Sequence, residues 1–91
     1  PLEVEERIDS LEGVVESAVI GLPDPDFGEA VTAVVVPAPG HALTERAIIG
    51  ALREEIATFK VPKRVFFADD LPRNAMGKVQ KNVLRSKYSA L

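Results

Sequence analysis

The segment with the clearest chemical potential is residues 69–78, which read Asp-Asp-Leu-Pro-Arg-Asn-Ala-Met-Gly-Lys and lie between an aromatic run and a basic run. Its proline, asparagine and glycine predict a surface loop, and loops held between rigid elements often carry function. Gly77 permits close backbone approach to a ligand, and the Lys78 ammonium is a compact charge suited to phosphate or carboxylate. The same residues also fit a turn glycine followed by one more solvated base, so the loop alone does not define a site.

Established phosphate-binding fingerprints do not fit this loop. A P-loop requires G-x-x-x-x-G-K-[S/T], but Pro72 stands at the first glycine position and Val79 follows the lysine. The six glycines also cannot be fitted to G-x-G-x-x-G, the dinucleotide fingerprint. The chain therefore brings no phosphate cradle of its own, and we expect no cofactor to bind the isolated domain.

Composition argues against metal and thiol chemistry. The chain has no cysteine and a single histidine, His41, which lies beside a Pro-Gly turn and is assigned no role. Asp24, Asp26 and Glu29 suit turn chemistry better than a cation site, which would need more converging oxygens. We therefore expect no metal site.

Periodicity and turn residues predict the elements that position the loop. They are a helix over 2–12, strands over 14–22 and 30–36, a helix over about 45–58, a strand over 64–68 and a helix over about 80–88. Thr44 is the expected N-cap of the middle helix, and the continuous apolar run 33–36 predicts a central strand covered on both faces. This order predicts an α+β fold, a small three-stranded sheet with covering helices.

Side chains near the loop are assigned to the core. Val79, Val83 and Leu84 form the expected apolar side of the last helix, with basic residues between them. Phe66 and Phe67 are expected in the sheet and core rather than on a base-stacking platform, because no second aromatic strand accompanies them.

Length and charge bound the class of protein. With 91 residues, 46% of them apolar, and a net charge of -3, the chain has the composition of one globular domain. Residues 1–30 hold nine acids against one base, whereas residues 60–91 hold eight bases against two acids. The basic end either attracts phosphate-bearing partners or is simply solvated.

The longest apolar stretch, 30–37, is far shorter than the roughly 20 residues of a membrane span, so we expect no membrane contact. Because the chain starts at Pro1 without Met, we expect a fragment of a longer cytoplasmic protein.

Four motifs follow one another along the chain. Residues 1–5 match P-x-E-[V/I]-E, residues 14–29 resemble a strand and loop that carry G-x-P-D and G-E, residues 59–62 match [Y/F]-K-x-P, and residues 71–78 match L-P-[R/K]-[T/S]-x-x-G-K apart from Asn74. Together they resemble the C-terminal domain of the acyl-adenylate-forming superfamily, which comprises acyl-CoA synthetases, peptide-synthetase adenylation domains and luciferases. The resemblance implies one compact, mobile domain over 1–91 that follows a large N-terminal domain and a hinge, both absent from this sequence.

The resemblance implies a catalytic role for Lys78, because the corresponding lysine of this family reaches the large domain's site and contacts the carboxylate and the nucleotide phosphate. A carboxylate that attacks the α-phosphate of ATP gathers negative charge in the transition state, and a positioned cation lowers that barrier. Pro72, Arg73, Asn74 and Gly77 would support the loop. The parent enzyme would use ATP with Mg²⁺ and coenzyme A.

Asn74 stands where most members have Thr or Ser, and residues 71–82 look most like the malonyl-CoA synthetase branch. That likeness implies malonate or methylmalonate as the acid. Bacterial members are acetylated at the lysine that corresponds to Lys78. The resemblance therefore also implies a protein lysine acetyltransferase and a deacetylase as partners.

Two other interpretations stay open. The chain could belong to the adenylation domain of a different carboxylate ligase, or it could be a free-standing basic module that binds nucleic acid or an acidic protein. The acidic first third and the lack of aromatic residues among the bases argue against nucleic acid. We therefore expect no nucleic-acid partner.

Overall fold

The computed structural model describes residues 2–25 and 28–89. In chain order they form α1 (Leu2–Asp9), β1 (Val14–Asp24), β2 (Gly28–Pro37), α2 (Glu45–Arg53), the 3₁₀ helix η1 (Thr58–Lys60), β3 (Arg64–Phe67) and α3 (Lys81–Ser89). The predicted α+β fold, a three-stranded sheet with covering helices, is confirmed. Pro1, which begins the first motif, and Asp26, one of the three acids of the turn after the first strand, lie outside the described residues.

The sheet has the order β1-β2-β3, so β2 is central, as the apolar run 33–36 predicts. β1 and β2 form an antiparallel hairpin, whereas β2 and β3 are parallel. Parallel neighbours need a crossover connection, and α2 lies in it. Thr44 caps this helix as predicted, because its side-chain oxygen accepts a hydrogen bond from the Ala47 N–H at 3.1 Å.

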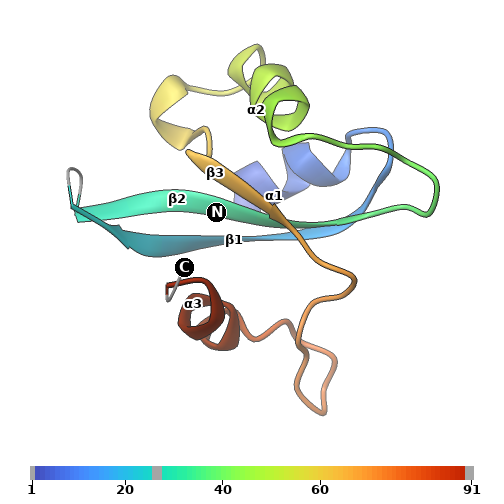
Figure 1. The fold of residues 1–91 in the computed structure, drawn as a ribbon, viewed down its shortest axis with the longest axis vertical. Coiled ribbons are helices and arrows are strands. Elements are labelled where there is room, and N and C mark those ends of the chain that lie inside the picture. Colours follow the sequence, from blue (N-terminus) through green and yellow to red (C-terminus); the bar gives the residue numbers. More distant parts are fainter. Residues whose placement is uncertain (1, 26–27, 90–91) are drawn as a thin grey trace.

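Helices cover both faces of the sheet, with α1 and α2 on one side and α3 on the other (Figure 1). Each side has its own apolar core. The first core contains Val4, Ile8, Val19, Ala33, Val35, Ile48, Leu52, Val61 and Val65. The second core contains Ala18, Ile20, Leu22, Val34, Val36, Leu71, Leu84 and Tyr88. Successive residues of β2 enter opposite cores, which is why its sequence is apolar at nearly every position.

The first two helices are shorter than predicted. α1 ends at Asp9 rather than at residue 12, and α2 ends at Arg53 rather than at residue 58. After α2 the chain makes a turn over residues 54–55, in which the Leu52 carbonyl accepts hydrogen bonds from the Glu55 and Ile56 N–H groups at 3.0 Å. This turn places Ile56 against the margin of the first core without a further turn of helix.

The hairpin strands are longer than predicted. Pairing of β1 with β2 continues to Asp24 and Gly28, beyond the expected ends at residues 22 and 30. Pro23 lies inside this paired region, where it is tolerated because β1 is an edge strand and one side of it needs no N–H donor.

Two expected core residues are exposed, and one buried residue was not predicted. Val83 is 42% exposed, because α3 buries Leu84 and Tyr88 and Val83 lies about 100° around the helix from Leu84. Phe67 is 39% exposed at the end of β3, on the face opposite that of Phe66. Phe66 stacks on Tyr88 with ring centroids 4.7 Å apart, so Tyr88 closes the second core.

Candidate active site

Residues 73–79, called the lysine hairpin below, fold back on themselves as a small antiparallel turn. Arg73 and Val79 form an isolated β-bridge. The Asn74 N–H donates to the Lys78 carbonyl at 3.0 Å, and the Gly77 N–H donates to the Asn74 carbonyl at 2.9 Å. These bonds give the hairpin a defined backbone.

The base of the lysine hairpin is tied to the body of the domain. Leu71, just before the hairpin, is buried in the second core with Leu84 of α3. The Pro72 carbonyl accepts a hydrogen bond from the Gln80 N–H at 2.8 Å and closes the base. From this base the hairpin extends away from the sheet, beside α3 (Figure 1).

Asn74 organises the hairpin with its side chain. Its Oδ1 accepts hydrogen bonds from the Met76 N–H at 2.9 Å and the Lys78 N–H at 3.0 Å. Asparagine favours such local side-chain to backbone bonds, which stabilise turns. The departure from Thr or Ser at this position therefore keeps an oxygen acceptor in the turn.

Gly77 is required by backbone conformation rather than by space. Its φ is +82°, in the left-handed region that glycine adopts without strain. A Cβ at this position would meet no other atom within 4 Å. Met76, beside it at the tip of the hairpin, is 91% exposed.

The Lys78 side chain is exposed, and over residues 2–25 and 28–89 its ammonium makes no hydrogen bond or ion pair. Two other lysines of the basic region form ion pairs: Lys60 with Glu3 at 3.0 Å and Lys81 with Glu5 at 2.6 Å. A lysine without an internal partner presents its full charge to an incoming anion.

Arg73, at the start of the hairpin, is held by Glu16 of β1. The two side chains form an ion pair in which Arg73 Nη1 lies 3.2 Å from Glu16 Oε2. Arg73 Nη1 also donates to the Leu71 carbonyl at 3.4 Å. The hydrogen bond to Glu16 raises the pKa of Arg73. Sequence reasoning missed Glu16, because it lies 57 positions from its partner and no local pattern marks it.

The acidic first third and the basic last third of the chain are partly paired with each other. The ion pairs of Glu3, Glu5 and Glu16 each join the two regions. The charge asymmetry of the sequence is thus in part an internal complementarity. This pairing reduces the number of cations available to an external partner.

A groove of about 450 Å³ runs beside the exposed edge of β1. Its apolar lining includes Val4, Val31 and Phe59, which is 80% exposed. Its charged lining mixes acids and bases: Glu3, Glu29, Lys60, Lys81 and Arg85. Lys78 does not line this groove, so the groove and the lysine hairpin are separate features.

The structure also bears on a metal site, on His41 and on a membrane span. Among the described residues, no group of three or more His, Cys, Asp or Glu side chains is placed to hold a metal ion. His41 is exposed and packs over Gly13, where an added Cβ would lie 2.7 Å from the His41 Nδ1. No helix in the described part of the chain is both long and apolar enough to cross a bilayer.

Comparison with known proteins identifies the family. The AMP-binding enzyme C-terminal domain matches residues 3–78, so the chain belongs to this family of AMP-forming acyl-CoA ligase domains. The 3-[(3aS,4S,7aS)-7a-methyl-1,5-dioxo-octahydro-1H-inden-4-yl]propanoyl:CoA ligase of Rhodococcus jostii (strain RHA1) is 52% identical over 87 residues, which are 96% of this chain and 17% of that protein. The long-chain-fatty-acid–CoA ligase FadD13 of Mycobacterium tuberculosis is 46% identical over 90 residues, 99% of this chain and 18% of that protein.

The fold of this chain is also similar to solved structures of acyl-CoA ligases. Apo MatB from Rhodopseudomonas palustris has a TM-score of 0.96 and 58% identity, and the match covers 99% of this chain and 18% of MatB. ATP-bound MatB has a TM-score of 0.95 and 57% identity over 98% of this chain. The chain thus spans about a sixth of the length of its relatives. The family uses ATP and coenzyme A, while the acids named for its members differ.

Proposed function

We propose that this chain, residues 1–91, is the C-terminal domain of an ATP-dependent, AMP-forming acyl-CoA ligase and that Lys78 is its catalytic residue. The observation that carries the proposal is an exposed, internally unpaired ammonium on a hydrogen-bonded hairpin, within the segment that matches the family. The domain would act against the large N-terminal domain of the same protein, after rotation about a hinge before Pro1. ATP and coenzyme A chemistry would place that protein in the cytoplasm.

Lys78 would act on the first half-reaction. A carboxylate oxygen of the acid forms a bond to the α-phosphorus of ATP as the bond to pyrophosphate breaks, and negative charge gathers on the phosphate oxygens. The Lys78 ammonium stabilises that charge, and pyrophosphate leaves. Mg²⁺ held by the large domain would neutralise phosphate charge. Pro72, Arg73, Asn74 and Gly77 would set the position of Lys78.

The isolated domain is expected to be inactive, because its sequence carries no phosphate-binding fingerprint and residues 2–25 and 28–89 form no metal site. The purified 91-residue chain should release no pyrophosphate from ATP in the presence of the acid. Release that depends on the acid would overturn this expectation.

The test of the proposal is Lys78→Ala in the full-length enzyme. Removal of a transition-state cation should raise the activation barrier of adenylate formation by about 3–4 kcal/mol. The rate of thioester formation from supplied acyl-adenylate should be largely unchanged. Lys87→Ala, an exposed lysine of α3, serves as the control and should change neither rate. Equal losses in both half-reactions would mean damage to folding or docking and would contradict the catalytic role.

Malonate or methylmalonate is the acid we propose, supported by the likeness of residues 71–82 to the malonyl-CoA synthetase branch. The acid pocket would lie in the large domain, so another carboxylate is the alternative. Comparison of kcat/KM for malonate, methylmalonate and a long-chain fatty acid in the full-length enzyme decides between them. A higher kcat/KM for the fatty acid would contradict the proposal.

Lys78 is also the proposed site of reversible acetylation. The support is its exposure on a projecting hairpin, whereas Lys60 and Lys81 are in ion pairs. Acetylation removes the charge that adenylation needs, so it should inactivate the enzyme, and a deacetylase should restore activity. Mass spectrometry after brief incubation with an acetyltransferase and acetyl-CoA tests the site. Label spread evenly over all lysines, or full adenylation with acetylated Lys78, would refute it.

The alternative of a free-standing basic module is weakened by the internal ion pairs. Gel-shift titration of the chain with nucleic acid at two salt concentrations tests it, because phosphate-driven binding weakens steeply with salt. We expect no shift at either concentration.

A further inference from the structure

The β1 strand contains a bulge that determines the face on which Glu16 lies. Pairing with β2 shifts between Val14 and Glu16, so one extra residue is inserted at Val15. Val14 packs against the first core, whereas Glu16 lies opposite Val36, a member of the second core. Side chains of a regular strand alternate, and Val14 and Glu16 would then share one face.

Because of the bulge, Glu16 faces the side of the sheet that carries the lysine hairpin. Bulges re-aim side chains and are common beside active sites. Here the re-aimed side chain is a carboxylate, and it meets the Arg73 guanidinium in an ion pair. Without the extra residue, either Val14 would leave the first core or Glu16 would point away from the hairpin.

The contact with Arg73 extends to Lys78 through a short series of bonds. Arg73 is followed by Asn74, which exchanges two hydrogen bonds with the Lys78 backbone: Asn74 Oδ1 accepts from the Lys78 N–H, and the Lys78 carbonyl accepts from the Asn74 N–H, both at 3.0 Å. The hairpin is therefore connected internally. A displacement of Arg73 displaces Lys78 with it.

We propose that Glu16 is a positioning residue for Lys78, acting through Arg73, an inference that rests on the proposed catalytic role of Lys78. Glu16 does not touch a reacting group. It fixes the direction in which the hairpin leaves the domain. The Glu16 and Arg73 side chains are 24% and 40% exposed, and such ion pairs contribute little to stability. The expected effect of losing Glu16 is therefore kinetic.

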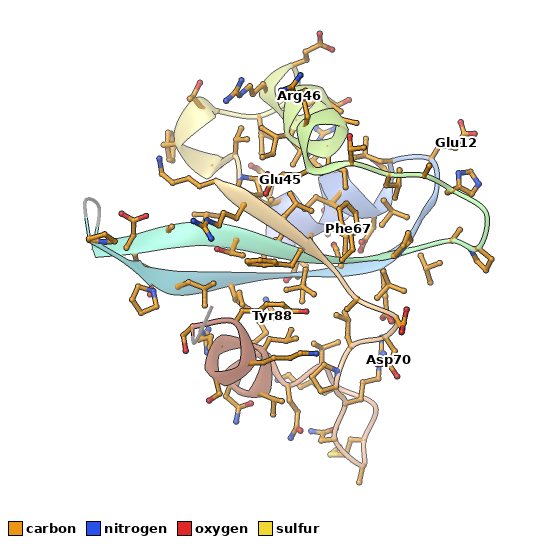
Figure 2. All side chains as sticks on the ribbon, viewed as in Figure 1. Glu12, Glu45, Arg46, Phe67, Asp70 and Tyr88 are labelled. Carbon is orange, nitrogen blue, oxygen red and sulfur yellow. The ribbon has the colours of Figure 1, made fainter. Side chains whose placement is uncertain are left out.

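The experiment uses the full-length enzyme and the variants Glu16→Ala, Arg73→Ala, the double variant and Lys78→Ala. Glu12→Ala is the matched control, because Glu12 is an exposed glutamate shortly before the bulge and points away from the hairpin (Figure 2). Rates of adenylate formation and of thioester formation from supplied acyl-adenylate are measured for each. Amide hydrogen exchange at residues 74–78 reports the order of the hairpin.

Glu16→Ala should lower kcat of adenylation by about 5- to 100-fold, since small misplacements of a catalytic group have effects of that size. Glu16→Ala should leave the rate of thioester formation and the melting temperature unchanged. The Glu12→Ala control should have the rates of the native enzyme in both half-reactions. The double variant should lose no more than the more impaired single variant, because the two residues act through one contact. Amide exchange at Lys78 should be faster in both single variants.

Four outcomes would overturn the proposal. If Lys78→Ala impairs adenylation but Glu16→Ala does not, the catalytic role stands and the positioning role falls. If Glu16→Ala slows both half-reactions equally, Glu16 has a structural role. If the rate losses of Glu16→Ala and Arg73→Ala multiply in the double variant, Glu16 does not act through Arg73. If Lys78→Ala has no effect, the proposed function falls, and the positioning role falls with it.

Discussion

The Glu5 carboxylate accepts a hydrogen bond from the backbone N–H of Val19 at 2.8 Å, and the same oxygen lies 2.6 Å from the Lys81 ammonium. One oxygen thus joins α1, the edge strand β1 and the first residue of α3. At the other edge of the sheet, the Glu45 carboxylate of α2 accepts a hydrogen bond from the Val65 N–H of β3 at 2.7 Å (Figure 2 labels Glu45). Free N–H groups at a sheet edge invite pairing with another chain, and these glutamates occupy them.

Glu5→Ala should destabilise the domain by about 1–3 kcal/mol, because it leaves the part-buried Val19 N–H without a partner and Lys81 without its carboxylate. Urea unfolding measures the loss, and amide exchange at Val19 should become faster. Glu6→Ala, one position along on the exposed side of α1, is the control and should change stability by less than about 0.5 kcal/mol. Equal effects of the two substitutions would refute the edge contact.

Asn74→Ala should loosen the lysine hairpin without unfolding the domain. It removes the acceptor for the Met76 and Lys78 N–H groups, two hydrogen bonds worth about 0.5–1.5 kcal/mol each, and should slow adenylation by the parent enzyme. Asn74→Asp retains the oxygen acceptor and should retain the protection of both amides. Hydrogen exchange at Met76 and Lys78 measures the difference. Equal protection in the Ala and Asp variants would contradict this role of the side chain.

Gly77 and Gly40 form a matched pair for testing the hairpin backbone. Both have φ of +82° and open space around an added Cβ. Gly77→Ala and Gly40→Ala should therefore cost similar stability, about 1 kcal/mol each, from backbone strain. Only Gly77→Ala should slow adenylation by the parent enzyme, since Gly40 lies outside the hairpin. The idea fails if Gly40→Ala slows adenylation as much as Gly77→Ala does.

Ionisation of Asp9 should lower the stability of the domain as pH rises above about 3.8, the ordinary pKa of Asp. Burial raises the pKa of Asp9 above its ordinary value of 3.8, although a hydrogen bond from Ser17 opposes the shift. The folded state then holds this proton more tightly than the unfolded state, so its contribution is lost as pH rises from the unfolded value through the raised pKa. Asp9→Asn, which keeps an oxygen acceptor for Ser17, should stabilise the domain at pH 7 relative to the native sequence.

The difference between Asp9→Asn and the native chain should disappear well below pH 3.8, where Asp9 is protonated in both states. Urea unfolding at pH 3 and pH 7 gives the comparison, and the other titrating groups cancel between the two chains. A larger gain for Asp9→Asn at pH 3 than at pH 7 would reverse the sign and disprove the argument.

Over the described residues, the sequence predicts the three α-helices, the three strands and the central place of β2, because these depend on local periodicity and on turn residues, but it does not predict the short 3₁₀ helix η1. Helix ends are less well predicted. α2 ends at Arg53, yet the apolar spacing continues to Ile56. Tertiary packing of Ile56 against the first core satisfies that spacing without a helix.

The lysine hairpin is visible in the sequence, but its attachment is not. Gly77 and Lys78 stand out by residue type and by family motif. Glu16 and Glu5 look like ordinary members of an acidic segment, and only the fold brings them to Arg73 and Lys81. The bulge at Val15 also leaves no local mark, because Val-Val-Glu reads as a regular strand.

The two cores differ in when their residues become available during synthesis. Every member of the first core has been made once residue 65 has been added, whereas the second core also needs Leu71, Leu84 and Tyr88. Chains fold from the N-terminal side as they are made, so one face of the sheet can be covered while the other still exposes its apolar side chains. A nascent or truncated chain that ends after β3 would therefore be prone to self-association, and the arrival of the lysine hairpin and α3 would end that vulnerable period.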